Sequence, residues 1–334
     1  ALRKAGRDVS DLVLAVNREF NLEDLVERIF RAEDKAALSG QDLDLGVGAY
    51  VWGEAIIQEL LPMLRRRGFG GRIILGGPQI TFMEEGFEAA YPQADVFIRG
   101  SAESALVAVS GTDAQISFPG VIYAHNKKPV TIGKADLEQH PSPWLSHDWS
   151  EEPVKFVRME TMRGCPYSCS FCQHRAPKRG KRLNHHAESR VFAEIDLFCA
   201  NRVESIAVLD PIFNISPIAT EVLQRFVRNR FEGKISLQCR PELLNEDFLI
   251  AASQLNVTLE FGLQTIHEIE SKAINRRNHM EKVEKSLKRV RELGIHHEVS
   301  LIFGLPEQTL HSFKQSVDWC LRHRVPVIKA FPLM

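Results

Sequence analysis

The segment METMRGCPYSCSFCQHR, residues 159–175, carries three of the six cysteines of the chain within eight residues. Cys165, Cys169 and Cys172 have the spacing C-x3-C-x2-C, so a compact loop can turn three thiolates towards one centre. Thiolates suit zinc or an iron–sulfur cluster. A structural zinc ion needs a fourth protein ligand, for which His174 is a candidate, whereas a four-iron cluster on three cysteines keeps one iron open. The spacing alone leaves both alternatives open.

The cysteine segment follows a predicted strand, VKFVRME (154–160), and five further strand-like runs follow it along the chain. These are SIAVLD (205–210), KISLQC (234–239), VTLEFG (257–262), EVSLIFG (298–304) and VIKAFPL (327–333). Helical patterns separate them near 187–200, 216–230, 245–254, 268–293 and 309–323. This alternation predicts a partial (β/α)6 barrel over residues 154–334, with its site at the carboxyl ends of the strands. We expect the C-terminal part of the barrel to lie beyond Met334.

The first 110 residues also alternate strands and helices. The strand-like runs are LVLAV (12–16), LDLGVGAYV (43–51), RIILGG (72–77) and DVFIRG (95–100). Helical patterns cover 21–38, with Asn21 as the N-cap, and 54–67, 84–90 and 102–109. This order predicts an α/β domain over residues 1–110, with a parallel sheet of flavodoxin-like or Rossmann-like type whose first strand lies upstream of Ala1. Five prolines punctuate residues 111–153, which we expect to form a connector with one short strand, VIYA (121–124).

The composition is that of an ordinary globular protein, with 44% hydrophobic and 25% charged residues among 334. The 42 basic and 43 acidic residues give a formal charge of −1, which argues against nucleic acid or anionic lipid as a partner. No apolar run approaches the ~20 residues of a membrane span, and the first residues lack the apolar stretch of a secretory signal. Clustered thiols without a disulfide pattern indicate a cytoplasmic protein.

The pattern RGCPYSCSFC, with an aromatic residue before the last cysteine, resembles the radical S-adenosylmethionine (SAM) superfamily. The resemblance implies a [4Fe–4S] cluster on Cys165, Cys169 and Cys172, with SAM on the open iron. An electron from the cluster would then cleave SAM to a 5′-deoxyadenosyl radical. LEFGLQT (259–265) and LIFGLPEQT (301–309) resemble the fourth-strand and fifth-strand segments of the superfamily. The residues thereby implied around SAM are Phe171, Asp210, Arg240, Glu260, Gln264, Ile302 and Gly304. The residues by themselves also allow an ordinary ion pair for Arg240 and structural roles for Ile302 and Gly304.

Three loops at the ends of the N-terminal strands resemble the cobalamin-binding domain of the cobalamin-dependent radical SAM family. They are YVW (50–52), GGPQ (76–79) and GSAE (100–103), although in the last only the first glycine and the glutamate match the family pattern. The residues thereby implied around cobalamin are Tyr50, Val51, Trp52, Gly76, Gly77, Pro78, Gln79, Gly100, Ser101 and Glu103. The same loops are also typical of tight βα turns and of core packing at strand ends.

These resemblances imply a methyltransferase that moves a methyl group from methylcobalamin to an unactivated carbon or phosphorus centre by way of the 5′-deoxyadenosyl radical. They also imply a small-molecule or peptide natural-product substrate and an electron donor such as flavodoxin or ferredoxin. Two alternatives stay open: a cyclase or rearrangement enzyme of the same architecture, and a non-catalytic module that binds cobalamin or zinc. An RNA-modifying enzyme has only the basic run RAPKRGKR (175–182) in its favour, and the near-neutral charge argues against it.

Overall fold

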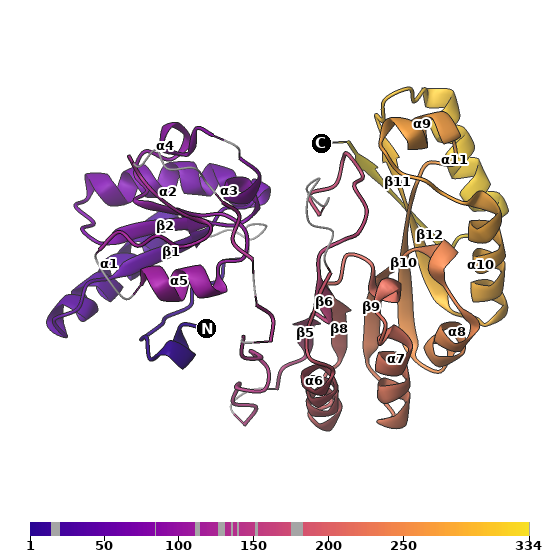
Figure 1. Cartoon of the computed structure of the whole chain (residues 1–334), viewed down its shortest axis with the longest axis horizontal. Coiled ribbons are helices and arrows are strands. Elements are labelled where there is room, and N and C mark those ends of the chain that lie inside the picture. The colour runs from indigo at the N-terminus through magenta and orange to yellow at the C-terminus, as the bar shows by residue number, and fades with distance from the viewer. Residues whose placement is uncertain are drawn as a thin grey trace. The chain divides into compact units, whose positions relative to one another are not determined.

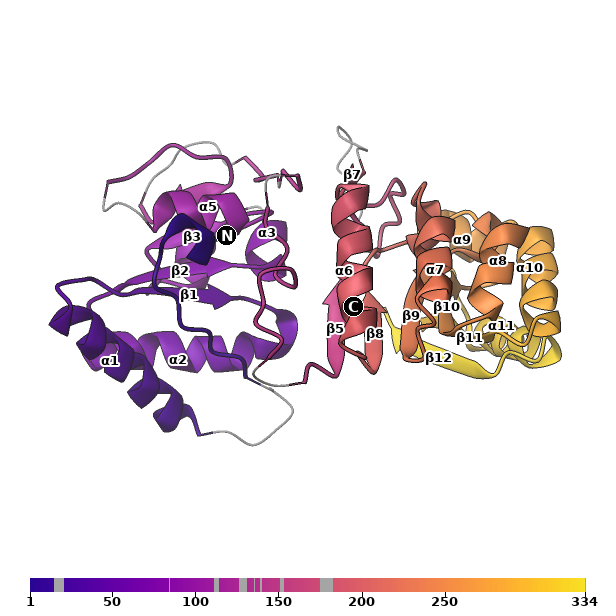
Figure 2. The same ribbon diagram turned by 90° about the horizontal axis from the view of Figure 1, so that it is seen from below.

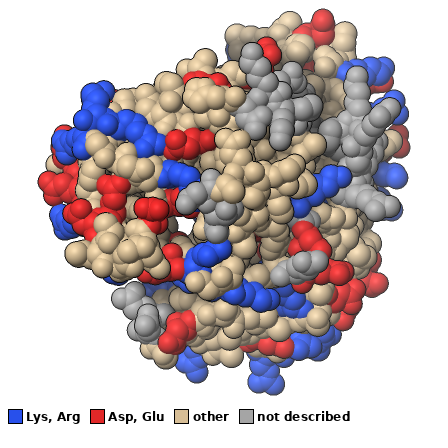
Figure 3. Space-filling view, turned by 60° about the vertical axis from the view of Figure 1, so that its left-hand side comes forward, with Lys and Arg blue, Asp and Glu red and all other residues tan. Residues whose placement is uncertain are grey.

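The computed structural model describes residues 1–14, 21–83, 85–110, 114–125, 131–134, 136–138, 140–150, 153–174 and 183–333. The chain divides into two compact units, Ala1–Asp136 and Leu137–Met334 (Figure 1). Among the residues that the structure describes, no helix is both long and apolar enough to cross a membrane. On the face drawn in Figure 3, acidic and basic side chains are interspersed, in keeping with the formal charge of −1.

The first unit is built on a four-stranded sheet in the order β1-β2-β3-β4 (Figures 1 and 2). The strands are β1 (Asp44–Gly48), β2 (Arg72–Gly76), β3 (Val96–Ile98) and β4 (Val121–Tyr123). The first three are parallel, as the alternation of strands and helices predicts. β4 is the short strand expected in the connector, and it runs antiparallel to β3 within this sheet.

Helices cover both faces of this sheet (Figure 2). α1 (Leu22–Leu38) and α2 (Glu54–Arg66) pack on one face, and α5 (Glu103–Val109) packs on the other. α1 begins as predicted at Asn21, whose side-chain oxygen accepts a hydrogen bond from the Glu23 N–H at 2.9 Å and so satisfies a free amide of the first turn. The two apolar cores of the unit lie on opposite faces of the same strands because successive side chains alternate across a sheet.

Local predictions for the first unit are wrong in three places. Residues 12–14 of the predicted strand 12–16 form no strand, and Val13 is 92% exposed; residues 15–16 lie outside the described residues. An apolar run becomes a strand only where a neighbouring strand pairs with it, and periodicity cannot report that. β1 stops short of residue 51, because the 3-10 helix η2 (Val51–Gly53) begins there. The helix predicted from residue 84 begins later, as α4 (Phe87–Ala90).

Two short elements of the first unit were not anticipated by the sequence pattern. They are η1 (Arg3–Ala5) and α3 (Pro78–Phe82), and α3 places a proline in its first turn. Proline is tolerated there because the first amides of a helix have no partner within the helix.

The second unit contains a six-stranded sheet in the order β12-β11-β10-β9-β8-β5, in which every neighbouring pair is parallel. All six predicted strands are present. They are β5 (Phe156–Met159), β8 (Ser205–Val208), β9 (Lys234–Cys239), β10 (Asn256–Gln264), β11 (His296–Phe303) and β12 (Val327–Pro332). Strands that are consecutive in this set are neighbours in space, and one or two helices connect each strand to the next.

Helices follow the strands and pack on one side of this sheet (Figure 1). They are α6 (Glu188–Ala200), α7 (Ala219–Arg228), α8 (Glu246–Ser253), α9 (Glu268–Ala273), α10 (Met280–Glu292) and α11 (Leu310–Arg322), with short turns η3 (Phe213–Ile215) and η4 (Pro241–Leu243). The single helix expected over 268–293 is two helices, because Asn275 between them takes a left-handed conformation with φ 51°.

Alternation along the strands separates the core from the functional face. In β10, Val257, Leu259, Phe261 and Leu263 are buried, whereas Thr258, Glu260, Gly262 and Gln264 are only partly buried. The buried set packs in the core beneath the helices. The alternate set faces the other side of the sheet, so a row of polar side chains is available to line a site there.

Candidate functional site

The cysteine loop follows the carboxyl end of β5. It leaves the short strand β6 (Met162–Arg163), which pairs antiparallel with β7 (Asn184–His185); this hairpin was not predicted. The fourteen-residue pattern from Met159 to Cys172 therefore runs from a buried strand into a loop, as the sequence indicated. In parallel α/β folds this strand end is where ligands bind.

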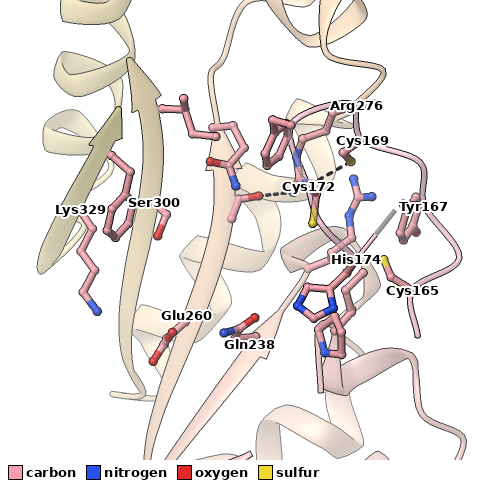
Figure 4. Close-up of a pocket in the computed structure, with 18 of the residues that line it drawn as sticks. Cys165, Tyr167, Cys169, Cys172, His174, Gln238, Glu260, Arg276, Ser300 and Lys329 are labelled. Atoms are coloured by element: carbon pink, nitrogen blue, oxygen red, sulfur yellow. Dashed lines mark hydrogen bonds between the residues drawn. The ribbon is translucent and has the colours of Figure 1, made fainter. Parts of the chain in front are cut away.

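A cavity of ≈ 470 Å³ opens beside the loop within the second unit. All three cysteines of the motif line it, together with residues at the ends of β8 to β12. Figure 4 shows the cysteines on one wall, with Ser300 and Lys329 across the cavity from them and Glu260 and Gln238 between. The strand order thus brings residues separated by more than 150 positions in sequence around one space.

The three thiols differ in exposure. Cys169 is buried at 5% exposure, whereas Cys165 and Cys172 are partly exposed. Burial raises the pKa of the Cys165 and Cys172 thiols, and the charge of the neighbouring cysteines raises it further. The charges of these sulfurs are therefore close enough to interact with one another. Three soft thiol donors beside an open cavity fit an iron–sulfur cluster that keeps one iron free for a further ligand.

His174 also lines the cavity, and burial lowers the pKa of its imidazole. It was the candidate fourth ligand of a zinc ion. Within the part of the chain that the structure describes, no three His, Cys, Asp or Glu side chains are grouped to hold a single metal ion. His174 and the three thiols thus line the same cavity without forming a compact set of ligands for one ion among the described residues.

Alkylation of the apoprotein at Cys165 and Cys172 is expected to depend steeply on pH. Because their pKa values lie above the ordinary range and the thiolate is the nucleophile, the rate should rise roughly tenfold per pH unit from pH 7 to pH 9. Iodoacetamide labelling followed by peptide mass spectrometry measures this rate. A small free thiol measured alongside should level off at lower pH. A plateau below pH 8 at both cysteines would contradict the expectation.

Arg240 follows β9 and is 4% exposed. Its guanidinium pairs with the buried Glu242 carboxylate at 2.5 Å, donates to the Arg277 carbonyl oxygen at 2.6 Å, and lies 4.1 Å from the centre of the Tyr167 ring. The residue reaches the cavity wall, as the sequence predicted, but it already has a carboxylate partner in the protein. The ion pair that the sequence left open is present, and it is buried.

Asp210 does not line the cavity. It is fully buried after β8, where its carboxylate accepts hydrogen bonds from the backbone N–H groups of Thr161 (2.8 Å) and Met162 (3.2 Å) and from the Thr161 hydroxyl. Burial raises the pKa of this carboxyl against the lowering effect of those hydrogen bonds. Asp210 therefore ties the ends of β5 and β8 together, while the next residues, Pro211 and Ile212, form the wall.

Of the other residues predicted around SAM, some line the cavity and one does not. Phe171, Glu260, Gln264 and Ile302 line the cavity, and Glu260 accepts a hydrogen bond from the Ser236 hydroxyl. Gly304 does not line it, and its N–H donates to the Gln308 side chain at 2.7 Å in a turn with φ 84°. Four of these five residues are therefore brought together around one space.

Among the residues of the cavity wall that sequence reasoning missed are Tyr167, Arg276 and Lys329. Lys329 on β12 pairs with Glu298 on β11, which raises the pKa of the ammonium group although burial opposes the shift. The sequence did hold a signal for Lys329, because a lysine interrupts the apolar run VIKAFPL at a position that faces the cavity. Tyr167 lies inside the cysteine motif, so the sequence alone could have identified it. Arg276 had no signal, since it follows a helix far from the motif.

In the first unit, the three predicted cobalamin loops share one edge of the sheet. YVW (50–52) follows β1, GGPQ (76–79) follows β2, and GSAE (100–103) follows β3. Tyr50 and Trp52 stack with ring centres 4.8 Å apart and are 39% and 65% exposed. These exposed aromatic rings form an apolar surface at the carboxyl edge of the sheet.

The glycines of these loops approach backbone of the same unit. A Cβ on Gly77 would lie 2.8 Å from the Ala49 carbonyl oxygen, and one on Gly100 would lie 2.2 Å from the Gly133 carbonyl oxygen. Both residues have positive φ, at 100° and 87°. The Gln79 N–H donates to Ala49 O at 3.2 Å, and the Ser101 N–H donates to Gly133 O at 3.1 Å. Close turn packing, the alternative that the sequence allowed, thus accounts for these two glycines.

Pro78 and Glu103 open helices at this edge, and Gly76 closes β2. Pro78 begins α3, Glu103 begins α5, and Val51 begins η2. All ten predicted cobalamin residues therefore lie in the three loops where the strands end. The structure places them together at one edge of the sheet of the first unit.

Known proteins resemble this chain in both sequence and fold. Residues 159–320 match the family model of the radical SAM superfamily. The chain is 27% identical over 299 residues to the cobalamin-dependent radical SAM methyltransferase TokK of Streptomyces tokunonensis, covering 82% of this chain and 44% of that protein. It is 25% identical over 318 residues to the 2-(S-pantetheinyl)-carbapenam-3-carboxylate methyltransferase of Streptantibioticus cattleyicolor, covering 85% and 45%. The chain thus spans less than half the length of these relatives.

Among solved structures, the fold resembles that of the radical SAM methyltransferase TsrM from Kitasatospora setae, with a TM-score of 0.72 at 18% identity. The alignment covers 92% of this chain and 64% of TsrM. The cysteines at the end of β5 thus lie within the segment that matches the radical SAM superfamily model, and most of the chain is similar in sequence to a cobalamin-dependent radical SAM methyltransferase.

Proposed function

We propose that this chain is the cofactor-binding part of a methyltransferase that methylates an unactivated carbon or phosphorus centre. The observation that carries the proposal is the cavity wall of Cys165, Cys169 and Cys172 beside polar strand ends. The names of the two curated relatives, both methyltransferases, support methyl transfer as the reaction. When bound, the cluster and SAM would supply a 5′-deoxyadenosyl radical, and cobalamin would supply the methyl group.

The residues of the chain would bind, orient and shield these groups. Cys165, Cys169 and Cys172 would hold the cluster. Phe171 and Ile302, which face the cavity and pack in one apolar group, suit the flat face of adenine. Glu260 and Gln264 on β10 present polar groups for ribose hydroxyls or the amino group of SAM. Arg276 brings positive charge to the cysteine wall, which complements a carboxylate, whereas the charge of Arg240 is already paired with Glu242.

The proposal extends to the fold type of each unit. We infer that the first unit is a flavodoxin-like cobalamin domain, with Tyr50 and Trp52 offering exposed aromatic surface to the corrin ring. We infer that the six parallel strands of the second unit are a partial (β/α)6 barrel. A natural-product substrate, a flavodoxin or ferredoxin as electron donor and a cytoplasmic location complete the proposal.

The test is anaerobic purification in the presence of hydroxocobalamin, followed by an optical spectrum and an assay of SAM cleavage. We expect a corrin spectrum, iron and sulfide at about four of each per chain, and 5′-deoxyadenosine on addition of a reductant. Bound zinc without sulfide would overturn the proposal in favour of a structural metal module. With a substrate in hand, a product heavier by about 14 Da is expected, whereas an unchanged skeleton mass would favour cyclisation or rearrangement.

A further inference from the structure

The segment between α9 and α10, residues 274–278, meets the cysteine loop along consecutive residues. We call this segment the clasp. The Ser170 N–H donates to the Ile274 carbonyl oxygen at 2.9 Å. The Asn275 amide nitrogen donates to the Ser168 carbonyl oxygen at 3.0 Å and to its hydroxyl at 2.9 Å.

Two further contacts involve the same two segments. The Arg276 Nη1 lies 3.9 Å from the Cys169 sulfur, as the dashed line in Figure 4 marks. The Phe171 ring packs against the apolar group that contains Ile274. Residues 168–170 of the loop thus contact residues 274–276, about 105 positions later in the chain.

The clasp is itself fixed to the sheet. The Asn278 amide donates to the carbonyl oxygens of Leu263 (2.8 Å) and Thr265 (3.1 Å) at the end of β10. Ile274 is 1% exposed in a small core with Ile302 and Leu305. A loop held by such a segment is ordered by the protein rather than by its ligand, which lowers the entropy lost when a ligand binds.

The charge of the clasp also faces the cysteines. Arg276 forms no ion pair with a described carboxylate, and its guanidinium donates to the Gly262 carbonyl oxygen as well as towards Cys169. A hydrogen bond and a positive charge at a ligating sulfur stabilise the more negative, reduced form of an iron–sulfur cluster. Arg277 is adjacent in sequence but exposed, and its side chain makes no contact with the cysteine loop among the described residues.

We propose that the clasp positions the cysteine loop and that Arg276, acting through Cys169, raises the reduction potential of the cluster. The second half rests on the proposed function, since it takes a [4Fe–4S] cluster as the occupant. The first half concerns the loop itself and can be tested on the apoprotein. Arg276 and Asn275 are thus positioning residues of the site.

The first experiment measures iodoacetamide labelling of Cys169 in the apoprotein by peptide mass spectrometry. Asn275→Gly keeps the left-handed backbone and removes the amide, so Cys169 should react about tenfold faster than in the unaltered chain. Asn275→Asp, which keeps the size of the side chain but not the N–H donors, should behave alike. Thermal unfolding confirms that each variant is folded. Unchanged labelling of Cys169 in both folded variants would overturn the positioning role.

The second experiment measures the midpoint potential of the reconstituted cluster, without SAM, by a redox titration followed by electron paramagnetic resonance. Arg276→Gln should lower the potential, whereas Arg277→Gln, which removes the same charge one residue away, should leave it nearly unchanged. Arg276→Lys keeps the charge and should fall between Arg276→Gln and the unaltered chain, and it replaces Arg276→Gln if that variant assembles no cluster. Equal potentials in the Arg276 and Arg277 variants would overturn the tuning role.

The two experiments separate the two proposals. If the unaltered chain assembles no cluster at all, the proposed function fails, while labelling of Cys169 still decides whether the clasp orders the loop. If the cluster assembles and cleaves SAM but the Asn275 and Arg276 variants match the unaltered chain, the clasp proposal fails alone.

Discussion

Alanine in place of Cys165, Cys169 or Cys172 is expected to reduce cleavage of SAM to below about 1% of the unaltered chain, because a cluster with an open iron needs all three thiolates. Each variant should also lose most of its iron and sulfide after anaerobic reconstitution. Chromatographic detection of 5′-deoxyadenosine after reduction with dithionite measures the activity. The three variants should be equally inactive, since the cysteines act as one unit.

Cys199→Ala is the matched control for this experiment. Cys199 is partly exposed on α6 and lies outside the cavity wall. Burial raises the pKa of its thiol to about 11, so it is mostly protonated at neutral pH and a weak ligand. The control should retain iron, sulfide and SAM cleavage. A motif variant that keeps full cleavage would rule out the cluster assignment.

Glu242→Ala is expected to destabilise the second unit by about 3–5 kcal/mol, because it leaves the buried Arg240 guanidinium without a counter-charge. Both side chains are nearly inaccessible, at 5% and 6% exposure. The remaining contacts of Arg240, the Arg277 carbonyl oxygen and the Tyr167 ring, carry no formal negative charge. Urea unfolding followed by tryptophan fluorescence reports mainly on this unit, since Trp144, Trp149 and Trp319 lie within it.

Two control variants test whether the burial of the charge causes this loss of stability. Glu246→Ala removes the partner of Arg289 on the surface, where solvent screens the pair, and should change stability little. The double variant Arg240→Met, Glu242→Leu should recover much of the loss, because it removes both buried charges together. Equal effects of Glu242→Ala and Glu246→Ala would show that burial does not govern this pair.

Local sequence patterns were enough to predict several elements of the fold, including the strands that carry the site. The Asn21 cap, the six strands of the second unit and the strand that precedes the cysteine loop are all present as predicted. Capping and periodicity are properties of neighbouring residues, so a single sequence displays them. The strand predicted at 12–16 is absent over residues 12–14. A strand needs a partner strand from elsewhere in the chain, and the local sequence does not show whether one is present.

The same division applies to the site residues. The cysteine motif, Phe171, Glu260, Gln264 and Ile302 were found from short patterns and do line one cavity. Asp210 and Gly304 had equally good positions at strand ends, but each is taken up by hydrogen bonds within the protein. The partner of Asp210 is Thr161, 49 positions away, so the segment of Asp210 could not reveal it. The partner of Gly304 is Gln308 in the same segment, but only the folded turn brings the two together.

The sequence by itself determined the six strands of the large sheet of the second unit and the trio of thiols, because both follow from the spacing of nearby residues. Only the tertiary structure decided that Arg276 reaches Cys169, that Glu242 neutralises Arg240, and that Gly77 and Gly100 pack against backbone. The contacts of Arg276, Gly77 and Gly100 join segments tens to about a hundred residues apart. Glu242 is only two residues from Arg240, but the burial that makes their pairing matter exists only once the strands have brought distant segments together.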